Sequence, residues 1–159
     1  RLQGFGVEIW GNNTNGRGVE YFDKCFSKDE IDEIFKNCDV VVSTMPCTKE
    51  TEGMFDKNKF SLMKEGSSFI NVGRGKNVKE DDLLLYLGKF KGVALDVFEQ
   101  EPLPKDSLLW DAENVIVTPH NCWVSEKNPI RVEKLMYSNL KKYKEGKELA
   151  NIVNVERGY

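Results

Sequence analysis

The chain has 159 residues, of which 40% are hydrophobic and 31% are charged, enough for one domain with a buried core. Its net charge of -3 gives no reason to expect a nucleic acid or an anionic membrane surface as partner, and its apolar runs are too short to span a bilayer. Its four cysteines lack CxxC spacing, so we expect reduced thiols in a cytoplasmic protein, without disulfides or a metal site.

Strand-like and helix-like segments alternate along the chain. VEIWG at 7–11 predicts a strand, and SKDEIDEIFKNC at 27–38 predicts a helix that begins with the capping pair Ser27 and Glu30. VVVST then predicts a buried strand, which Pro46 ends. The remaining predicted elements are a helix at 57–66, a strand at 68–72, a helix at 77–88 with Asn77 and Glu80 at its start, strands at 92–97 and 114–118, and a long amphipathic helix from about 125 to 145.

This alternation predicts an α/β fold, a Rossmann-type doubly wound parallel sheet with helices on both faces. Ligands bind such sheets beyond the carboxyl ends of the strands. Three chemically useful residues follow three different strands: Arg74 after SFINV, Glu101 after GVALDV and His120 after NVIVT. We therefore expect a guanidinium, a carboxylate and an imidazole at one rim of the sheet.

The three side chains suit the reduction of a small 2-keto acid. Arg74 can hold the substrate carboxylate with two parallel N–H donors. His120 can protonate the carbonyl oxygen, and Glu101 can orient the imidazole and keep it charged. Spacing alone leaves plainer interpretations open: a solvated turn for Arg74, a charged loop for Glu101 and a hydrogen-bonded structural role for His120.

Several motifs resemble those of one enzyme family. FINVGRGKNVKEDDLLLYL, GVALDVFEQEPLPKDSLLW and NVIVTPHN are similar to the cofactor-domain motifs of the D-isomer-specific 2-hydroxyacid dehydrogenases, and NCDVVVSTMPCTKETEGMF to the segment before them. The resemblance covers about residues 5–159. It implies an NAD- or NADP-dependent enzyme in which Arg74 binds substrate, Glu101 pairs with the histidine, and His120 is the acid and base. It also implies cofactor contacts from Thr44, Pro46 and the backbone at Gly73, with Asp96 holding the nicotinamide carboxamide.

Glu101 also separates branches of that family. The formate dehydrogenase branch has glutamine in place of the paired glutamate, so Glu101 favours the hydroxyacid branch.

The family's GxGxxG fingerprint is absent from this chain, because each of its Gly-x-Gly sequences lacks the third glycine. We therefore expect a truncated chain and an incomplete sheet, in which the first strand and the glycine turn are missing and a gap lies between VEIW and SFINV. Residues 1–124 would form a partial dinucleotide-binding domain, and residues 125–159 a helix and tail that return toward the missing substrate domain. The expected partner is the missing N-terminal half of the same protein, without which the chain would be inactive.

The acidic residue that binds the adenosine ribose in this family is replaced here. Asn13 stands near its place, followed by Thr14 and Arg17. Loss of the carboxylate removes repulsion toward a 2′-phosphate, and Arg17 offers it a positive charge. We expect NADP to be accepted. The alternative is an ordinary polar turn that tolerates either cofactor.

Two further points stay open. Trp123 either forms a wall of the substrate pocket or caps the following helix, and the particular 2-keto acid is not defined by these residues.

The resemblance implies a homodimer. A different class of function also fits the same three residues, since some members of the superfamily are dinucleotide-sensing corepressors rather than enzymes.

Overall fold

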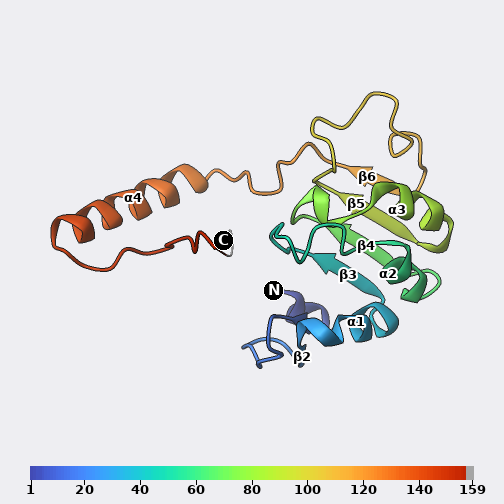
Figure 1. Cartoon of the computed structure of the whole chain (residues 1–159), viewed down its shortest axis with the longest axis horizontal. Coiled ribbons are helices and arrows are strands. Elements are labelled where there is room, and N and C mark those ends of the chain that lie inside the picture. The colour runs from blue at the N-terminus through green and yellow to red at the C-terminus, as the bar shows by residue number, and fades with distance from the viewer. Residues whose placement is uncertain (157–159) are drawn as a thin grey trace. The chain divides into compact units, whose positions relative to one another are not determined.

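The computed structural model describes residues 1–156 and divides into two compact units, Arg1–Pro119 and His120–Tyr159 (Figure 1). The division falls slightly before the boundary after residue 124 that the sequence predicts. Residues 157–159 of the predicted tail lie outside the described residues. Within the described part of the chain, no helix has the length and apolar character needed to cross a membrane.

The first unit begins with a small sheet. After the short 3-10 helix η1 (Leu2–Phe5), strand β1 (Trp10–Asn12) pairs in parallel with β2 (Lys24–Phe26). The ring centroids of Trp10 and Phe26 lie 5.1 Å apart, so the two strands also share an aromatic contact. The sequence predicted β1 slightly early and missed β2.

A four-stranded parallel sheet forms the centre of this unit. Its strands are β3 (Val40–Ser43), β4 (Ser68–Asn71), β5 (Gly92–Leu95) and β6 (Val115–Val117), in the order β3-β4-β5-β6. The predicted α/β class with parallel strands is confirmed. The predicted position of the gap is wrong, because β3 pairs directly with β4, with Val40 opposite Ser68. The break lies instead between the small sheet and the four-stranded sheet. The predicted gap was beside SFINV, which is β4, and β3 fills that position.

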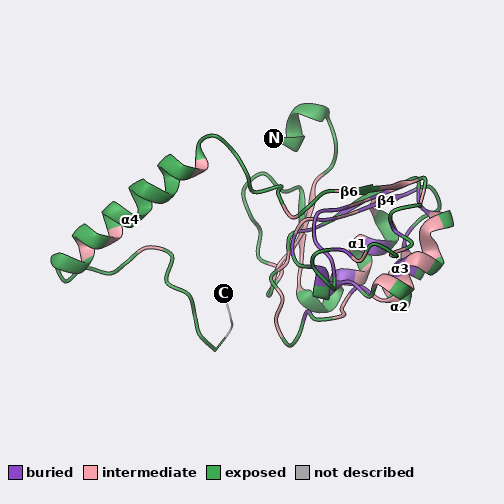
Figure 2. Cartoon of the chain, turned by 90° about the horizontal axis from the view of Figure 1, so that it is seen from above, coloured by how far each residue is buried: buried purple, intermediate pink, exposed green. Residues whose placement is uncertain are grey.

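Helices α1 (Ile31–Asn37), α2 (Lys57–Leu62) and α3 (Glu80–Tyr86) lie on one side of this sheet (Figure 2). Short 3-10 turns precede α1 (η2, Lys28–Glu30) and precede and follow α3 (η3, Gly75–Asn77; η4, Leu87–Lys89). The main contributors to the core between helices and sheet are Phe35, Phe60, Leu83, Phe69 and Val93.

The predicted capping pair of the first helix, Ser27 and Glu30, is confirmed. The Glu30 carboxylate accepts hydrogen bonds from the Ser27 hydroxyl at 2.6 Å and from the Ser27 backbone N–H at 3.0 Å. These two bonds lower the pKa of Glu30.

The opposite face of the four-stranded sheet is open. Val40 and Val42 on β3 are 52% and 49% exposed, and Ile116 on β6 is 67% exposed. Among the described residues of this unit, no helix covers that face. One physical reason is local: residues 13–23, which connect β1 to β2, are rich in asparagine and glycine and lack a helical apolar period.

The second unit consists mainly of α4 (Asn128–Lys144). It begins about one turn later than the sequence predicts, with Pro129 in its first turn, where proline costs no hydrogen bond. Asn139 then ties the following segment to the helix through two hydrogen bonds with Ala150, of 2.9 and 3.0 Å.

Candidate active site

The Arg74 turn follows β4 directly. The fully buried Asn71 shapes it: Oδ1 accepts the N–H of Gly73 and Nδ2 donates to the carbonyl of Arg74, both at 3.1 Å. The Arg74 side chain is exposed, and its Nη1 donates to the Gly73 carbonyl at 2.7 Å. A buried amide thus fixes the backbone while the guanidinium faces solvent at the carboxyl end of the sheet.

The two glycines beside Arg74 are required by close backbone approach. A Cβ on Gly73 would lie 2.7 Å from the Met45 carbonyl oxygen, and a Cβ on Gly75 only 1.8 Å from that of Phe98. Neither site has room for a side chain. The Arg74 turn is therefore pressed between the segment after β3 and the segment after β5.

The segment after β3 carries the predicted cofactor residues Thr44 and Pro46, and both are exposed. The segment is fixed by the buried Asn77, whose Nδ2 donates to the carbonyls of Met45 at 3.1 Å and Pro46 at 3.3 Å. Thr51 donates a further hydrogen bond to the Pro46 carbonyl, at 2.7 Å. The predicted role of Asn77 at the start of α3 is therefore wrong, because its amide is buried against these carbonyls instead.

The segment after β5 carries Glu101. Its Oε1 accepts the backbone N–H of Phe98 at 3.0 Å, which fixes one oxygen of the carboxylate within its own turn. Because Phe98 also receives the close approach of Gly75, the Arg74 turn and the Glu101 turn lie against each other. The structure thus brings two of the three predicted catalytic residues onto neighbouring turns.

Asp96 is 2% exposed at the end of β5. Its Oδ1 accepts a hydrogen bond of 2.6 Å from the Thr118 hydroxyl, and its backbone N–H donates to Asn71 at 3.0 Å. Asp96 therefore joins the ends of β4, β5 and β6. At the end of β3, the buried Ser43 hydroxyl makes no hydrogen bond with any described residue, which leaves an unused polar group near this edge.

The loop after β1 holds Asn13, Thr14 and Arg17 in an ordered turn. Asn13 Nδ2 donates to the Arg17 carbonyl at 2.8 Å, and Asn13 Oδ1 accepts the N–H of Asn15 at 3.2 Å. The side chains of Thr14 and Arg17 are exposed. The loop thus presents amide, hydroxyl and guanidinium groups, without a carboxylate between residues 13 and 17.

His120 opens the second unit. It is half-buried, with φ 49°, a left-handed conformation that is uncommon outside glycine. Its carbonyl accepts the Trp123 indole N–H at 3.0 Å, and the Trp123 carbonyl in turn accepts a hydrogen bond from Asn128 at the start of α4. Trp123 is 64% exposed. The predicted grouping of His120 with Arg74 and Glu101 stays a prediction.

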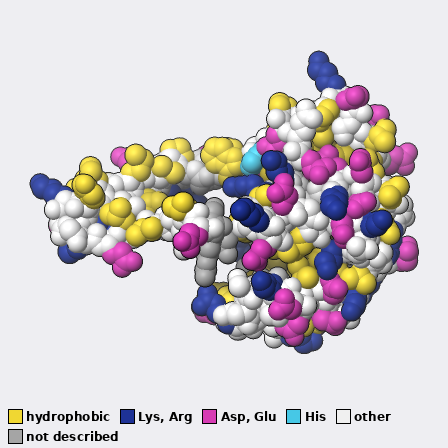
Figure 3. Space-filling view, viewed as in Figure 1, with side chains coloured by type: hydrophobic (Ala, Val, Ile, Leu, Met, Phe, Trp, Pro, Cys, Tyr) yellow, Lys and Arg dark blue, Asp and Glu magenta, His cyan; other side chains and the backbone are white. Residues whose placement is uncertain are grey.

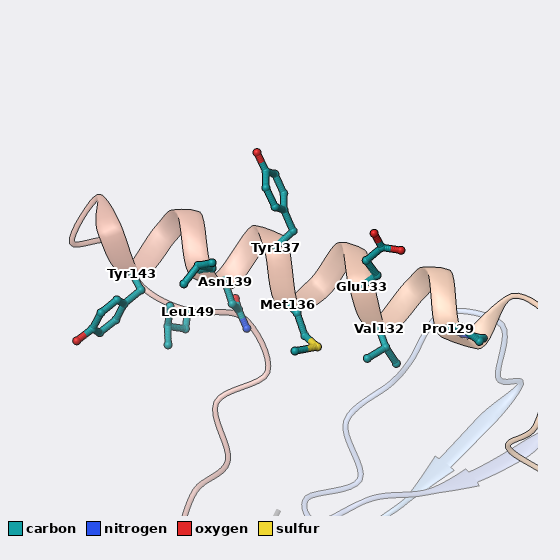
Figure 4. Close-up of a pocket in the computed structure, with 9 residues that line it drawn as sticks. Pro129, Val132, Glu133, Met136, Tyr137, Asn139, Tyr143 and Leu149 are labelled. Atoms are coloured by element: carbon teal, nitrogen blue, oxygen red, sulfur yellow. The ribbon is translucent and has the colours of Figure 1, made fainter.

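A shallow apolar groove lies along α4, with hydrophobic side chains over this helix on the face that Figure 3 shows. Val132 and Met136 project from one side of the helix, and Glu133 and Tyr137 from the other (Figure 4). Leu149, from the segment after the helix, also lines the groove.

The described residues include all four cysteines, and no disulfide joins them. Across residues 1–156, no group of three or more histidine, cysteine or acidic side chains is placed to hold a metal ion.

The parallel sheet, with polar groups at the carboxyl ends of its strands, defines a domain of the dinucleotide-binding class. The chain belongs to the D-isomer specific 2-hydroxyacid dehydrogenases, whose NAD binding domain model matches residues 1–122. The family resemblance read from the sequence is thereby confirmed.

Named relatives and solved structures similar to this chain belong to the same group of enzymes. The chain is 32% identical over 162 residues to glyoxylate/hydroxypyruvate reductase A of Escherichia fergusonii, covering 100% of this chain and 50% of that protein. A D-isomer specific 2-hydroxyacid dehydrogenase from Xanthobacter autotrophicus, solved with NADPH and MES, matches with a TM-score of 0.89 and 32% identity, over 97% of this chain and 64% of that one. The NADPH-dependent glyoxylate/hydroxypyruvate reductase of Sinorhizobium meliloti, solved with NADP and sulfate, gives a TM-score of 0.90 and 29% identity, over 99% and 51%. The chain spans about half the length of the curated relatives it matches.

Proposed function

We propose that this chain is the larger part of the cofactor domain of an NAD(P)-dependent oxidoreductase that interconverts a small 2-keto acid and a D-2-hydroxy acid. The observation that carries the proposal is the contact between the Arg74 turn and the Glu101 turn through Gly75 and Phe98. It brings the turns that carry Arg74 and Glu101 together at the edge of the sheet where such enzymes bind their ligands, which supports the proposal.

Each catalytic residue has a defined task. Arg74 binds the substrate carboxylate through paired N–H donors, and its exposed position leaves it accessible to a small anion. His120 donates a proton to the carbonyl oxygen in reduction and takes it back in oxidation. Glu101, with one oxygen held by the Phe98 N–H, orients the imidazole and stabilises its charged form. The nicotinamide cofactor, when bound, supplies or accepts the hydride.

The residues on this chain fit such a cofactor. Thr44 and Pro46 are exposed, the Gly73 backbone packs against this segment, and Asp96 adds a carboxylate at the same edge. We assign these four positions to the nicotinamide side of the cofactor.

We propose further that NADP is accepted. The turn formed by Asn13, Thr14 and Arg17 carries no carboxylate to repel a 2′-phosphate, and Arg17 gives it a positive partner. Related proteins were solved with NADPH or NADP, which supports this choice. Comparing KM for NADPH and NADH tests it, and a strong preference for NADH would contradict it.

For the substrate, we propose glyoxylate or hydroxypyruvate, the compounds named for two relatives. We assign Trp123 to the wall of the pocket, because its indole N–H is already bound to the His120 carbonyl while most of its ring is exposed. Trp123→Ala should then raise KM for the keto acid. An unchanged KM would leave Trp123 only the role of supporting the start of α4.

We propose that the working protein also contains the substrate half of the family, N-terminal to these residues, and that it is a cytoplasmic homodimer. The open sheet face with Val40, Val42 and Ile116 supports a further covering segment, because an apolar face of a parallel sheet is normally covered. The groove on α4 offers a second apolar surface, suited to a contact with that half. Expression of residues 1–159 alone should give no turnover, whereas the complete natural polypeptide should be active and elute as a dimer.

The enzyme assay follows absorbance at 340 nm with NADPH or NADH and a panel of 2-keto acids. We expect the complete protein to oxidise the cofactor in the presence of a keto acid. His120→Ala should abolish this oxidation. Cofactor binding without turnover on any keto acid would contradict an enzyme and favour the corepressor-like alternative.

A further inference from the structure

The Glu101 turn is attached to α3 by two hydrogen bonds between Glu80 and Glu99. The Glu80 carboxylate accepts the backbone N–H of Glu99 at 2.6 Å, and the Glu99 carboxylate accepts the backbone N–H of Glu80 at 3.2 Å. The two residues are 19 positions apart in the sequence. We call this reciprocal arrangement the Glu80–Glu99 pair.

The pair solves a problem at the start of α3. The residue before that helix, Lys79, makes no side-chain capping bond, so the first N–H groups need an acceptor from elsewhere. The Glu99 carboxylate supplies one, in a position where a negative charge is favoured by the helix dipole. Glu80 returns the bond to the Glu99 backbone. The turn after β5 is therefore fixed to the first residue of a helix.

The pair acts next to the catalytic carboxylate. Two consecutive N–H groups of this turn are each bound by a carboxylate: that of Phe98 by Glu101, and that of Glu99 by Glu80. The same Phe98 backbone contacts Gly75 beside Arg74. A shift of Glu99 would thus move the backbone that orients Glu101 and the surface against which the Arg74 turn rests.

This arrangement carries an electrostatic cost. Burial raises the pKa of Glu80, and the nearby charges of Glu99 and Asp81 act in the same direction, although the Glu99 N–H opposes them. A neutral acceptor would cap the same N–H without repelling Glu99. Capping of α3 requires only the Glu99 carboxylate, so the bond from the Glu99 N–H to the Glu80 carboxylate is not needed for the start of the helix.

We propose that Glu80 is a positioning residue for the reaction: by holding the Glu99 N–H, it fixes the turn from which Glu101 orients the proton-donating histidine. The inference depends on the proposed function. Glu80 itself lies outside the groups assigned to substrate and cofactor.

The test uses the complete natural polypeptide and three variants. Glu80→Ala removes the acceptor, and kcat should fall about tenfold or more, since displacement of a catalytic group by about 1 Å can cost that much. KM for NADPH should change by less than about twofold, because the Thr44–Pro46 segment is held by other residues. Glu80→Gln keeps an oxygen acceptor at the same place and should restore most of kcat. In Glu80→Ala, the pH dependence of kcat should shift, because the histidine would lose part of its carboxylate support.

Asp82→Ala is the matched control. Asp82 lies on the same helix and its carboxylate also accepts a distant backbone N–H, that of Lys57, at 3.0 Å. This bond joins α3 to α2 rather than to the Glu101 turn. Asp82→Ala and Glu80→Ala should both lower the denaturation midpoint, but Asp82→Ala should keep the kcat and pH profile of the natural protein.

The outcomes are separable. An active natural protein whose Glu80→Ala variant keeps its kcat and pH profile would overturn the inference alone. Equal loss of kcat in Asp82→Ala and Glu80→Ala would also overturn it, because the effect would then be general destabilisation. A natural protein that reduces no 2-keto acid would overturn the proposed function, and this inference with it.

Discussion

Gly75→Ala should disturb both the stability of the protein and its catalytic rate. The added Cβ would lie 1.8 Å from the carbonyl oxygen and 1.9 Å from the carbonyl carbon of Phe98. Both atoms are backbone, so no side chain can rotate away to make room. The Arg74 turn and the Glu101 turn would have to separate by about 1 Å, since contacts below 3.0 Å are essentially not observed for real Cβ atoms.

Two magnitudes follow from that displacement. Overpacking of a close-packed contact costs about 1–3 kcal/mol, and a contact this short belongs at or above the upper end of that range. For the reaction, a displacement of about 1 Å between Arg74 and Glu101 can reduce the rate by about a hundredfold. We therefore expect a fall of about 3 kcal/mol in the free energy of unfolding and a fall of about a hundredfold in kcat/KM.

Gly88→Ala is the control for this experiment. A Cβ at Gly88 meets nothing within 4 Å, and the residue lies in the short turn η4 that continues α3. The same change of residue should there alter stability by less than about 1 kcal/mol, with kcat/KM unchanged. Urea denaturation of the complete protein and the 340 nm assay give the two quantities. A Gly75→Ala protein with the midpoint and rate of Gly88→Ala would refute the close contact between the two turns.

Three further changes test other parts of the site. Arg74→Lys should lower kcat/KM for the keto acid by about tenfold to a hundredfold at unchanged cofactor affinity, because a lysine cannot form the paired bonds to a carboxylate. Asn77→Leu should lower the free energy of unfolding by about 2 kcal/mol in urea denaturation, since it removes the donor of the Met45 carbonyl and leaves the Pro46 carbonyl only its bond from Thr51. Asp56→Ala should remove the cap of α2 and cost about 1 kcal/mol at neutral pH. Burial alone would raise the pKa of Asp56, but the backbone N–H groups of Lys59 and Asn58 lower it below its unfolded value. Its stabilising effect is therefore present above about pH 4 and is lost as the pH falls through the folded pKa, so the two proteins should converge in acid.

Signals confined to a few neighbouring residues predicted structure well. Ser27 and Glu30 mark the start of the first helix because their hydrogen bonds span three positions. The apolar runs of β3, β4 and β5 correctly predicted strands, although the predicted burial of VVVST is wrong, since Val40 and Val42 are 52% and 49% exposed. Their parallel pairing follows from the helices between them, and so does the shared edge that carries Arg74 and Glu101.

Features that depend on distant partners were not predictable. Strand β2 has only three residues, and its partner β1 is 14 positions away in the pairing. Asparagine is a residue type that often begins helices, but the Asn77 amide binds the carbonyl of Met45, 32 positions earlier. The acceptor for the first turn of α3 comes instead from Glu99. In each case the structure is determined by a contact with a residue distant in the sequence, which a local sequence pattern cannot predict.

The Gly-Arg-Gly sequence shows how these two kinds of information combine. Its glycines indicate a turn, and its place after a strand locates Arg74 at the edge of the sheet. Only the structure explains why both neighbours of Arg74 are glycine, since Gly73 meets the Met45 backbone and Gly75 meets the Phe98 backbone. One close-packed stack thus connects the cofactor segment, the arginine turn and the Glu101 turn. A change at either glycine should therefore alter both cofactor and substrate kinetics, although neither glycine carries a side chain that could contact a ligand.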